Sequence, residues 1–181
     1  IISNSDNNLL TGSGSKITNG VNGVGYNTVF GKDNDLDTVQ QCLVNGLSHE
    51  LTGVNNALVS GNDNNIFANT GQNIALLGRG LNAGIQIGEG CLIIGRFNDN
   101  TNAAAIAQGE SVFQVGVGVG QGAGARENAL NIVNNGSQNS TIYMDGLVSK
   151  NYVDDAAATA AGILVGGLYH TDGVVKINIT P

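Results

Sequence analysis

Three aspartates at alternating positions, Asp33, Asp35 and Asp37, are the residues best spaced for chemistry in this sequence. Calcium binds several carboxylate oxygens gathered at one bend, and this spacing resembles the opening of a calcium loop. The sixth position of such a loop is Thr38 instead of glycine, and the twelfth is Val44 instead of glutamate. The pattern therefore excludes an EF-hand and predicts a solvated acidic turn, while leaving open whether an ion binds there.

The remaining reactive side chains do not form a catalytic motif. His49 and His170 are the two imidazoles, and neither lies beside a serine or cysteine nucleophile motif. Cys42 and Cys91 lack the spacing of a zinc site or a disulfide framework, so they are expected to be buried free thiols. Glycines 116–124 include no basic residue and precede no helix pattern, which excludes a phosphate-binding loop. We expect no enzyme activity and no cofactor; a depolymerase with paired carboxylates at subunit grooves is the catalytic alternative.

Composition and charge exclude several classes of fold and binding partner. The 181 residues include 28 glycines and abundant asparagine, which favour tight turns and disfavour long helices. The formal net charge is −7, and the basic residues are scattered singly, so neither nucleic acid nor an anionic membrane is an expected partner. No apolar run approaches the roughly 20 residues that span a bilayer.

Short repeats dominate residues 8–98. Apolar residues recur seven apart, and the segments GLSHELTG, GVNNALVSG, GQNIALLG and GEGCLIIG share one template of glycine, polar residues, a short apolar strand and glycine. A coiled coil has the same period, but glycine costs roughly 1 kcal/mol per residue in a helix, so the pattern predicts stacked strands and tight turns. The expected fold class is all-β, with a short-repeat parallel roll.

Each repeat offers too few apolar side chains to enclose a wide core within one chain. We therefore expect a homotrimeric fibre, intertwined or side by side, with apolar residues on a shared axis. The helix that is expected near the C-terminus would add its alanine-rich face. The candidate residues for this trimer core are Leu43, Leu51, Leu58, Ile66, Leu76, Ile93, Val153, Ala157 and Ala160.

The repeats over residues 8–98 resemble the left-handed parallel β-roll heads of trimeric autotransporter adhesins, a fold that bacteriophage fibres also use. The next segment is similar to the closing module of such fibres, with FQVG at 113–116, a stretch at 125–130 and an Asn135-Gly136 turn. The predicted domains are a roll shaft at 1–98, a β-rich closing module at 99–148, a helix at 149–162 and a hairpin segment at 163–181. Ser149 is expected to cap the helix, and the hairpin is expected to turn at Asp172-Gly173.

The terminal sequence DDAAATAAGILVGGLYHTDGVVKINIT is similar to the end segment of many bacteriophage head-fibre and tail-fibre proteins. This resemblance implies a non-catalytic structural protein on the virion surface that contacts other virion proteins and host-surface carbohydrate. The alternative is the head of a bacterial trimeric adhesin. An adhesin is expected to carry a membrane-anchoring β-barrel at its C-terminus, whereas the expected last element here is a short hairpin before Pro181. An ice-binding solenoid would require a threonine ladder, and the threonines here are scattered.

Overall fold

The computed structural model describes residues 2–3, 7–18, 25–66, 72–83, 87–98, 110–122, 125–134, 140–144, 147 and 150–179. The chain forms two compact units, Ile1–Tyr143 and Met144–Pro181. We call the first the solenoid unit and the second the terminal unit.

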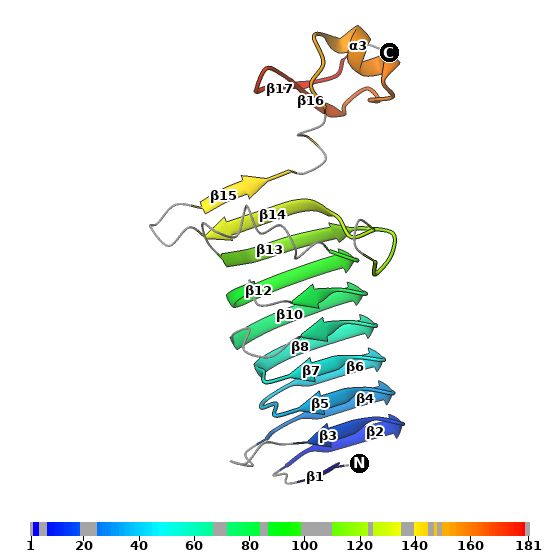
Figure 1. Cartoon of the computed structure of the whole chain (residues 1–181), viewed down its shortest axis with the longest axis vertical. Helices are drawn as coiled ribbons and strands as arrows, with labels where there is room; N and C mark the ends of the chain where they lie inside the picture. The colour runs from blue at the N-terminus through cyan, green and yellow to red at the C-terminus, as the bar shows by residue number, and fades with distance from the viewer. Residues whose placement is uncertain are drawn as a thin grey trace. The chain divides into compact units, whose positions relative to one another are not determined.

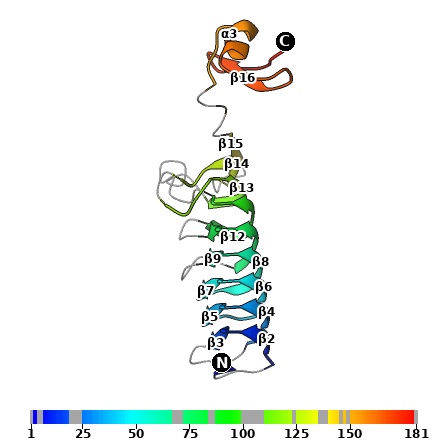
Figure 2. The same ribbon diagram turned by 90° about the vertical axis from the view of Figure 1, so that its right-hand side faces the viewer.

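The solenoid unit is a parallel β-solenoid of about five turns, which confirms the predicted repeat fold of stacked strands and turns (Figure 1). Its six-stranded sheet contains β1 (Ile2–Ser3), β3 (Lys16–Thr18), β5 (Asp35–Asp37), β7 (Glu50–Thr52), β9 (Asn65–Ile66) and β11 (Asn82–Ala83). Its nine-stranded sheet contains β2 (Leu9–Ser13), β4 (Thr28–Lys32), β6 (Leu43–Leu47), β8 (Asn55–Asn62), β10 (Gln72–Arg79), β12 (Ile87–Arg96), β13 (Glu110–Val117), β14 (Asn128–Asn134) and β15 (Ser140–Tyr143). Figure 2 shows the two sheets as facing layers.

One regular coil consists of two short repeats, one of seven residues and one of eight. The chain runs along a strand of the nine-stranded sheet, turns a corner, runs along a strand of the six-stranded sheet and turns a second corner. Val44 pairs with Val59 in the next coil of one sheet, and Leu36 pairs with Leu51 in the other, so stacked residues are fifteen apart in these coils. Residues seven apart therefore lie on different sheets of the same coil.

The two corners that connect the sheets differ in whether their length in residues stays the same from coil to coil. From an inward residue of the nine-stranded sheet to the next inward residue of the six-stranded sheet, the spacing is seven residues in successive coils, as from Val59 to Ile66. We call this the fixed corner. The return path is eight residues from Leu51 to Val59 but ten from Ile66 to Leu76. We call this the variable corner.

Inward-facing side chains of both sheets fill the interior of the solenoid. Strands place alternate residues on opposite faces, so each strand contributes one or two such side chains. The fully buried members include Ile17, Val29, Leu36, Val44, Leu51, Val59, Ile66, Leu76 and Ile93. A single chain thus encloses its own apolar core, which the repeat analysis did not expect.

Glycine is required where the strands β2, β4, β6, β8, β10 and β12 of the nine-stranded sheet enter the fixed corner. Gly61 has a φ of +123°, and a Cβ atom there would lie 1.8 Å from the carbonyl oxygen of Gly78 in the next coil. Only a residue without a side chain allows the coils to approach this closely. The stacked positions are Gly12, Gly31, Gly46, Gly61, Gly78 and Gly95.

Parallel stacking in the nine-stranded sheet continues through β13, and β14 and β15 then add in antiparallel fashion. Arg126 lies at this end of the stack, where its Nη1 donates hydrogen bonds to the carbonyl oxygens of Gly80 (2.8 Å) and Asn98 (3.2 Å). The turn predicted at Asn135-Gly136 falls outside the described residues.

The terminal unit combines α3 (Asp155–Ala160) with a hairpin of β16 (Leu168–Thr171) and β17 (Val174–Ile177). The helix begins later than the expected residue 149, because Asp154 is the N-cap and its carboxylate accepts a hydrogen bond from the Ala157 amide at 2.8 Å. The hairpin turns at Asp172 and Gly173, both with positive φ, and this confirms the predicted turn.

Candidate functional site

The outer face of the nine-stranded sheet carries a column of apolar side chains, one per strand. Register places these residues opposite one another from β2 to β15, with Thr28 and Ala75 as the small members. Leu43 is 44% exposed and Leu58 is 41% exposed. We call this column the outer apolar ladder; its large members are Leu9, Leu43, Leu58, Leu92, Phe113, Ile132 and Ile142.

A second outward column runs beside the outer apolar ladder. It contains Phe30, Leu77, Ile94, Val115 and Leu130, with polar residues at its other positions. The third outward column, toward the fixed corner, carries the exposed cations Lys32, Arg79 and Arg96. The same column also contains the exposed Leu47 and Val117, so this margin of the face mixes basic and apolar side chains.

The outer face of the six-stranded sheet has a different character. Its outward column contains Lys16, Asp35, Glu50, Asn65 and Asn82 in register. Lys16 Nζ lies 3.9 Å from Asp35 Oδ1, and both side chains are substantially exposed. Water solvates such a face well, so the apolar surface of the solenoid unit is concentrated on the nine-stranded sheet.

The fixed corner is held by a second kind of column, in which buried side chains bond the backbone of the next coil. Asn34 Oδ1 accepts a hydrogen bond from the His49 amide at 3.1 Å, and His49 Nδ1 accepts one from the Asn64 amide at 3.2 Å. Asn64 Oδ1 then accepts one from the Leu81 amide at 2.9 Å. We call the column Ser15, Asn34, His49 and Asn64 the corner ladder. It satisfies amides that the turn leaves without sheet partners.

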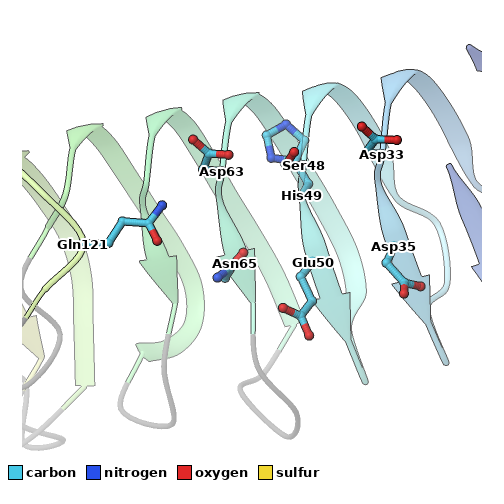
Figure 3. Close-up of a pocket in the computed structure, with 8 residues that line it drawn as sticks. All are labelled: Asp33, Asp35, Ser48, His49, Glu50, Asp63, Asn65 and Gln121. Carbon is cyan, nitrogen blue, oxygen red and sulfur yellow. The ribbon is translucent and has the colours of Figure 1, made fainter. Parts of the chain in front are cut away.

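Acidic side chains gather beside the corner ladder in a groove of about 470 Å³. Figure 3 shows Asp33, Ser48 and Asp63 on successive turns of the fixed corner, with Asp35, Glu50 and Asn65 on successive strands of the six-stranded sheet. Gln121, from the segment that follows β13, also lines the groove. Stacking of coils brings these residues together across 15- and 30-residue separations.

Asp33 and Asp35 of the aspartate triplet line this groove, whereas Asp37 is exposed at the end of β5. Lys32 Nζ lies 3.3 Å from Asp33 Oδ2. Within the described ranges, no group of three or more His, Cys, Asp or Glu side chains is arranged to hold a metal ion.

The two cysteines are buried on the variable-corner side of the core, as expected from the sequence. Burial raises the pKa of the Cys42 thiol to about 11 and that of the Cys91 thiol to about 12. Thiols with such pKa values are weak nucleophiles at neutral pH.

The candidate trimer-core residues fall into three groups. Leu51, Ile66, Leu76 and Ile93 are fully buried inside the chain's own core, so they have no surface left for a partner. Leu43 and Leu58 lie on the outer apolar ladder, with surface available for association. Val153, Ala157 and Ala160 belong to the terminal unit, where Val153 is 75% exposed, Ala160 is exposed and Ala157 is half-buried. Their role on a trimer axis stays a prediction.

The terminal unit keeps polar and aromatic groups inside and apolar side chains outside. Tyr169 Oη donates a hydrogen bond to the Asp155 carboxylate, which raises the pKa of Tyr169 to about 12. Asn178, also buried, donates to Thr159 Oγ1 and to the Ile163 carbonyl oxygen. Among the described residues of this unit, the large exposed apolar side chains are Met144, Val153, Leu164, Val165, Leu168, Val174, Val175, Ile177 and Ile179.

The sequence interpretation missed the corner ladder and the glycine column. Both repeat at fifteen residues, as in Gly31, Gly46 and Gly61, and in Asn34, His49 and Asn64. A search at a period of fifteen residues, the length of one regular coil, would have found them.

Among the described residues, no helix is long and apolar enough to cross a membrane. Comparison with models of protein families, with curated proteins and with solved structures gives no match to this chain.

Proposed function

We propose that this chain is a segment of a homotrimeric bacteriophage virion fibre, on the head or the tail, that serves structure and host attachment without catalysis. The solenoid units pack side by side through the outer faces of their nine-stranded sheets. The outer apolar ladder is the observation that carries this proposal.

A largely apolar column that crosses nine strands, with Leu9, Leu43, Leu58 and Ile142 exposed, is unusual for a surface that faces only water. Full burial of a leucine side chain contributes roughly 1.5–3 kcal/mol, so covering the exposed fraction of Leu43 or Leu58 contributes about 1 kcal/mol each. Association costs several kcal/mol, which a repeated column can offset and a single side chain cannot. Repetition along the stack is what makes side-by-side packing favourable.

Identical copies are the partner that fits such a face. Cyclic symmetry about an axis parallel to the stack places the same ladder of each chain at the same height. Closure of the ring then covers every copy of the ladder, and the resemblance of residues 8–98 to trimeric β-rolls favours three copies.

Assignment to a virion rests on the similarity of the terminal sequence to bacteriophage fibre ends. Its order of elements is an alanine-rich helix, then VGGLY, then a hairpin whose last strand contains VKI. The head of a bacterial trimeric adhesin is the second candidate, favoured by the repeats at 8–98.

Attachment would use exposed polar side chains along the variable corner. Asn56 Nδ2 donates to Asn73 Oδ1 at 3.1 Å in the next coil, and both residues have positive φ. Amide groups both donate and accept, as binding to sugar hydroxyls requires. Of the aromatic candidates for stacking on sugars, Tyr26 is 53% exposed, Tyr143 is half-buried, Phe97 is buried and Phe67 lies outside the described residues.

Light scattering tests the assembly, with an expected mass near three times 18.4 kDa. Leu58→Asp should abolish association, because three carboxylates would crowd a dry interface. Gln40→Glu is the matched control, since it adds one negative charge at an exposed position away from the outer apolar ladder. A folded monomeric wild type, or a trimeric Leu58→Asp variant with unchanged melting, would contradict the proposed interface.

Binding to host envelopes and to isolated surface polysaccharide tests the attachment role. Retention of the trimer without shortening of the polysaccharide is expected, with multivalency raising avidity by roughly 10² to 10⁴ over one site. Shortened polysaccharide would overturn the non-catalytic proposal. Absence of retention on every host fraction would overturn the attachment role and leave a purely structural one.

A further inference from the structure

His49 is the one ionisable side chain in the corner ladder, where the neighbouring coils have Asn34 below and Asn64 above. Its residue is 1% exposed. His49 therefore takes part in the hydrogen bonds that join three successive coils at the fixed corner.

The hydrogen bonds of the ring define its protonation state. Nδ1 faces the Asn64 amide at 3.2 Å and must accept, so the proton of the neutral ring lies on Nε2. Nε2 lies 3.2 Å from the Asn45 carbonyl oxygen, which accepts that proton. Both ring nitrogens are thus satisfied only when the imidazole is neutral.

Protonation of Nδ1 would make it a donor that faces the N–H of Asn64, so two donors would oppose each other in a closely packed corner. A Cβ atom on Gly46 would lie 2.7 Å from Nε2, so the ring packs closely against the Gly46 backbone, while His49 also borders the acidic groove. Desolvation by burial lowers the pKa of His49 and outweighs the opposing effects of the Asn45 carbonyl and the Asp63 charge. The position within the ladder consequently disfavours the imidazolium.

The acidic groove next to the ring offers the opposite environment. Asp33 and Asp63 approach from the fixed corner, and Asp35 and Glu50 from the six-stranded sheet. The nearby cations are Lys32, 3.3 Å from Asp33, and Lys16, 3.9 Å from Asp35. Four carboxylates against two ammonium groups leave the groove negative, and a positive ring that rotates into it gains attraction and hydration.

We propose that His49 is an acid-operated latch between the coils that contain β6 and β8. The neutral ring lies in the corner ladder and bonds Asn64, whereas the protonated ring leaves the ladder, enters the acidic groove and releases the Asn64 amide. This inference concerns a single chain and does not depend on the proposed assembly.

The pH range follows from the direction of the shift. An exposed histidine has a pKa of about 6.5, and the ring inside the ladder has a lower one. The carboxylates of the groove raise the pKa of the ring in the outer position above that of an exposed histidine, so only well above that raised value do both positions hold the neutral ring and leave the ladder intact. As the pH falls below the pKa of the outer position, the ring binds the proton there first, and each further pH unit shifts the equilibrium about tenfold toward it until the pKa of the ring in the ladder is reached.

Hydrogen exchange of the Asn64 amide in the full chain tests the latch, with rates corrected for the intrinsic effect of pH. In the wild type we expect Asn64 protection to fall at least tenfold between pH 7.5 and pH 5. His49→Asn should keep its protection at both pH values, because asparagine occupies the equivalent positions of the adjacent coils. Asp63→Asn combined with Glu50→Gln should move the midpoint to lower pH.

NMR of the imidazole nitrogens of wild type provides a second measurement that needs no variant. It should show a neutral Nε2–H tautomer at pH 7.5 that becomes doubly protonated as Asn64 loses protection. Equal pH responses in wild type and His49→Asn would overturn the proposal. So would protonation of His49 without any change at Asn64, or a ring that stays neutral throughout this range.

Discussion

Replacement of Gly61 by alanine tests the close stacking of coils at the fixed corner. The backbone there has a φ of +123°, a region that costs a residue with a side chain about 1–3 kcal/mol. The added Cβ would also lie 1.8 Å from the Gly78 carbonyl oxygen, so β8 and β10 must separate by about 1.2–1.6 Å to reach even a tight contact.

Separation lengthens the hydrogen bonds that join β8 to β10 around Gly61, and each such bond contributes roughly 1 kcal/mol. Strain and weakened bonds together predict that Gly61→Ala lowers the free energy of unfolding by about 3–5 kcal/mol. Gly90→Ala is the matched control, because Gly90 also has a positive φ of +78° but has open space where a Cβ would lie. Its expected loss is only the roughly 1–2 kcal/mol of the left-handed conformation.

Chemical denaturation followed by far-ultraviolet circular dichroism measures both variants at one fixed protein concentration. Fixed concentration matters because association contributes to apparent stability. A Gly61→Ala variant within about 1 kcal/mol of Gly90→Ala would refute the steric reasoning, because both would then report backbone conformation alone.

Three further predictions concern the corner ladder, the cysteines and the helix cap. Asn64→Ala should lower the free energy of unfolding by about 3 kcal/mol, since it removes the side-chain partner of the buried Leu81 amide and of the Gly78 carbonyl; Asn65→Ala, at an outward position, should cost under about 1 kcal/mol. Cys42 and Cys91 should react with a thiol reagent at pH 8 only after unfolding, and stability should decline as the pH rises above about 9, where unfolded thiols ionise but the folded thiols, with raised pKa values, do not; rapid labelling of the native chain would contradict this. Asp154→Ala should remove about 1 kcal/mol from the terminal unit, observed as faster amide exchange in α3, whereas Asp172→Asn should leave α3 unchanged.

The repeat fold was predictable because glycine, asparagine and apolar residues recur at short intervals, whereas the stacking register was not. A spacing of seven connects Leu51 and Leu58, but Leu51 is inward on one sheet and Leu58 is outward on the other. In β8 the adjacent residues Leu58 and Val59 are both apolar and point to opposite faces, so hydropathy does not distinguish core from outer surface. Residues at fifteen-residue spacing share both sheet and face, and they carry the missing information.

The acidic groove and the latch were beyond sequence reasoning for a different reason. Asp33 and Asp63 are 30 residues apart, and they approach each other only because two intervening turns of the stack are closely spaced. His49 was correctly assigned no nucleophile partner from its sequence neighbours, but its hydrogen-bond partners Asn34 and Asn64 belong to other coils. The start of the helix in the terminal unit was expected at Ser149, but Asp154 is the N-cap and its carboxylate accepts from the Ala157 amide.

Unequal corners give the chain one flank that can change and one that cannot. Every glycine and amide contact of the fixed corner constrains its length, so a residue added there would displace all later coils. At the variable corner the path from Ile66 to Leu76 is two residues longer than that from Leu51 to Val59, while the sheets on either side keep their register. Selection can therefore lengthen or exchange segments along this single flank, one per coil, without refolding the scaffold. The same flank is the natural place to graft foreign peptides in evenly spaced copies.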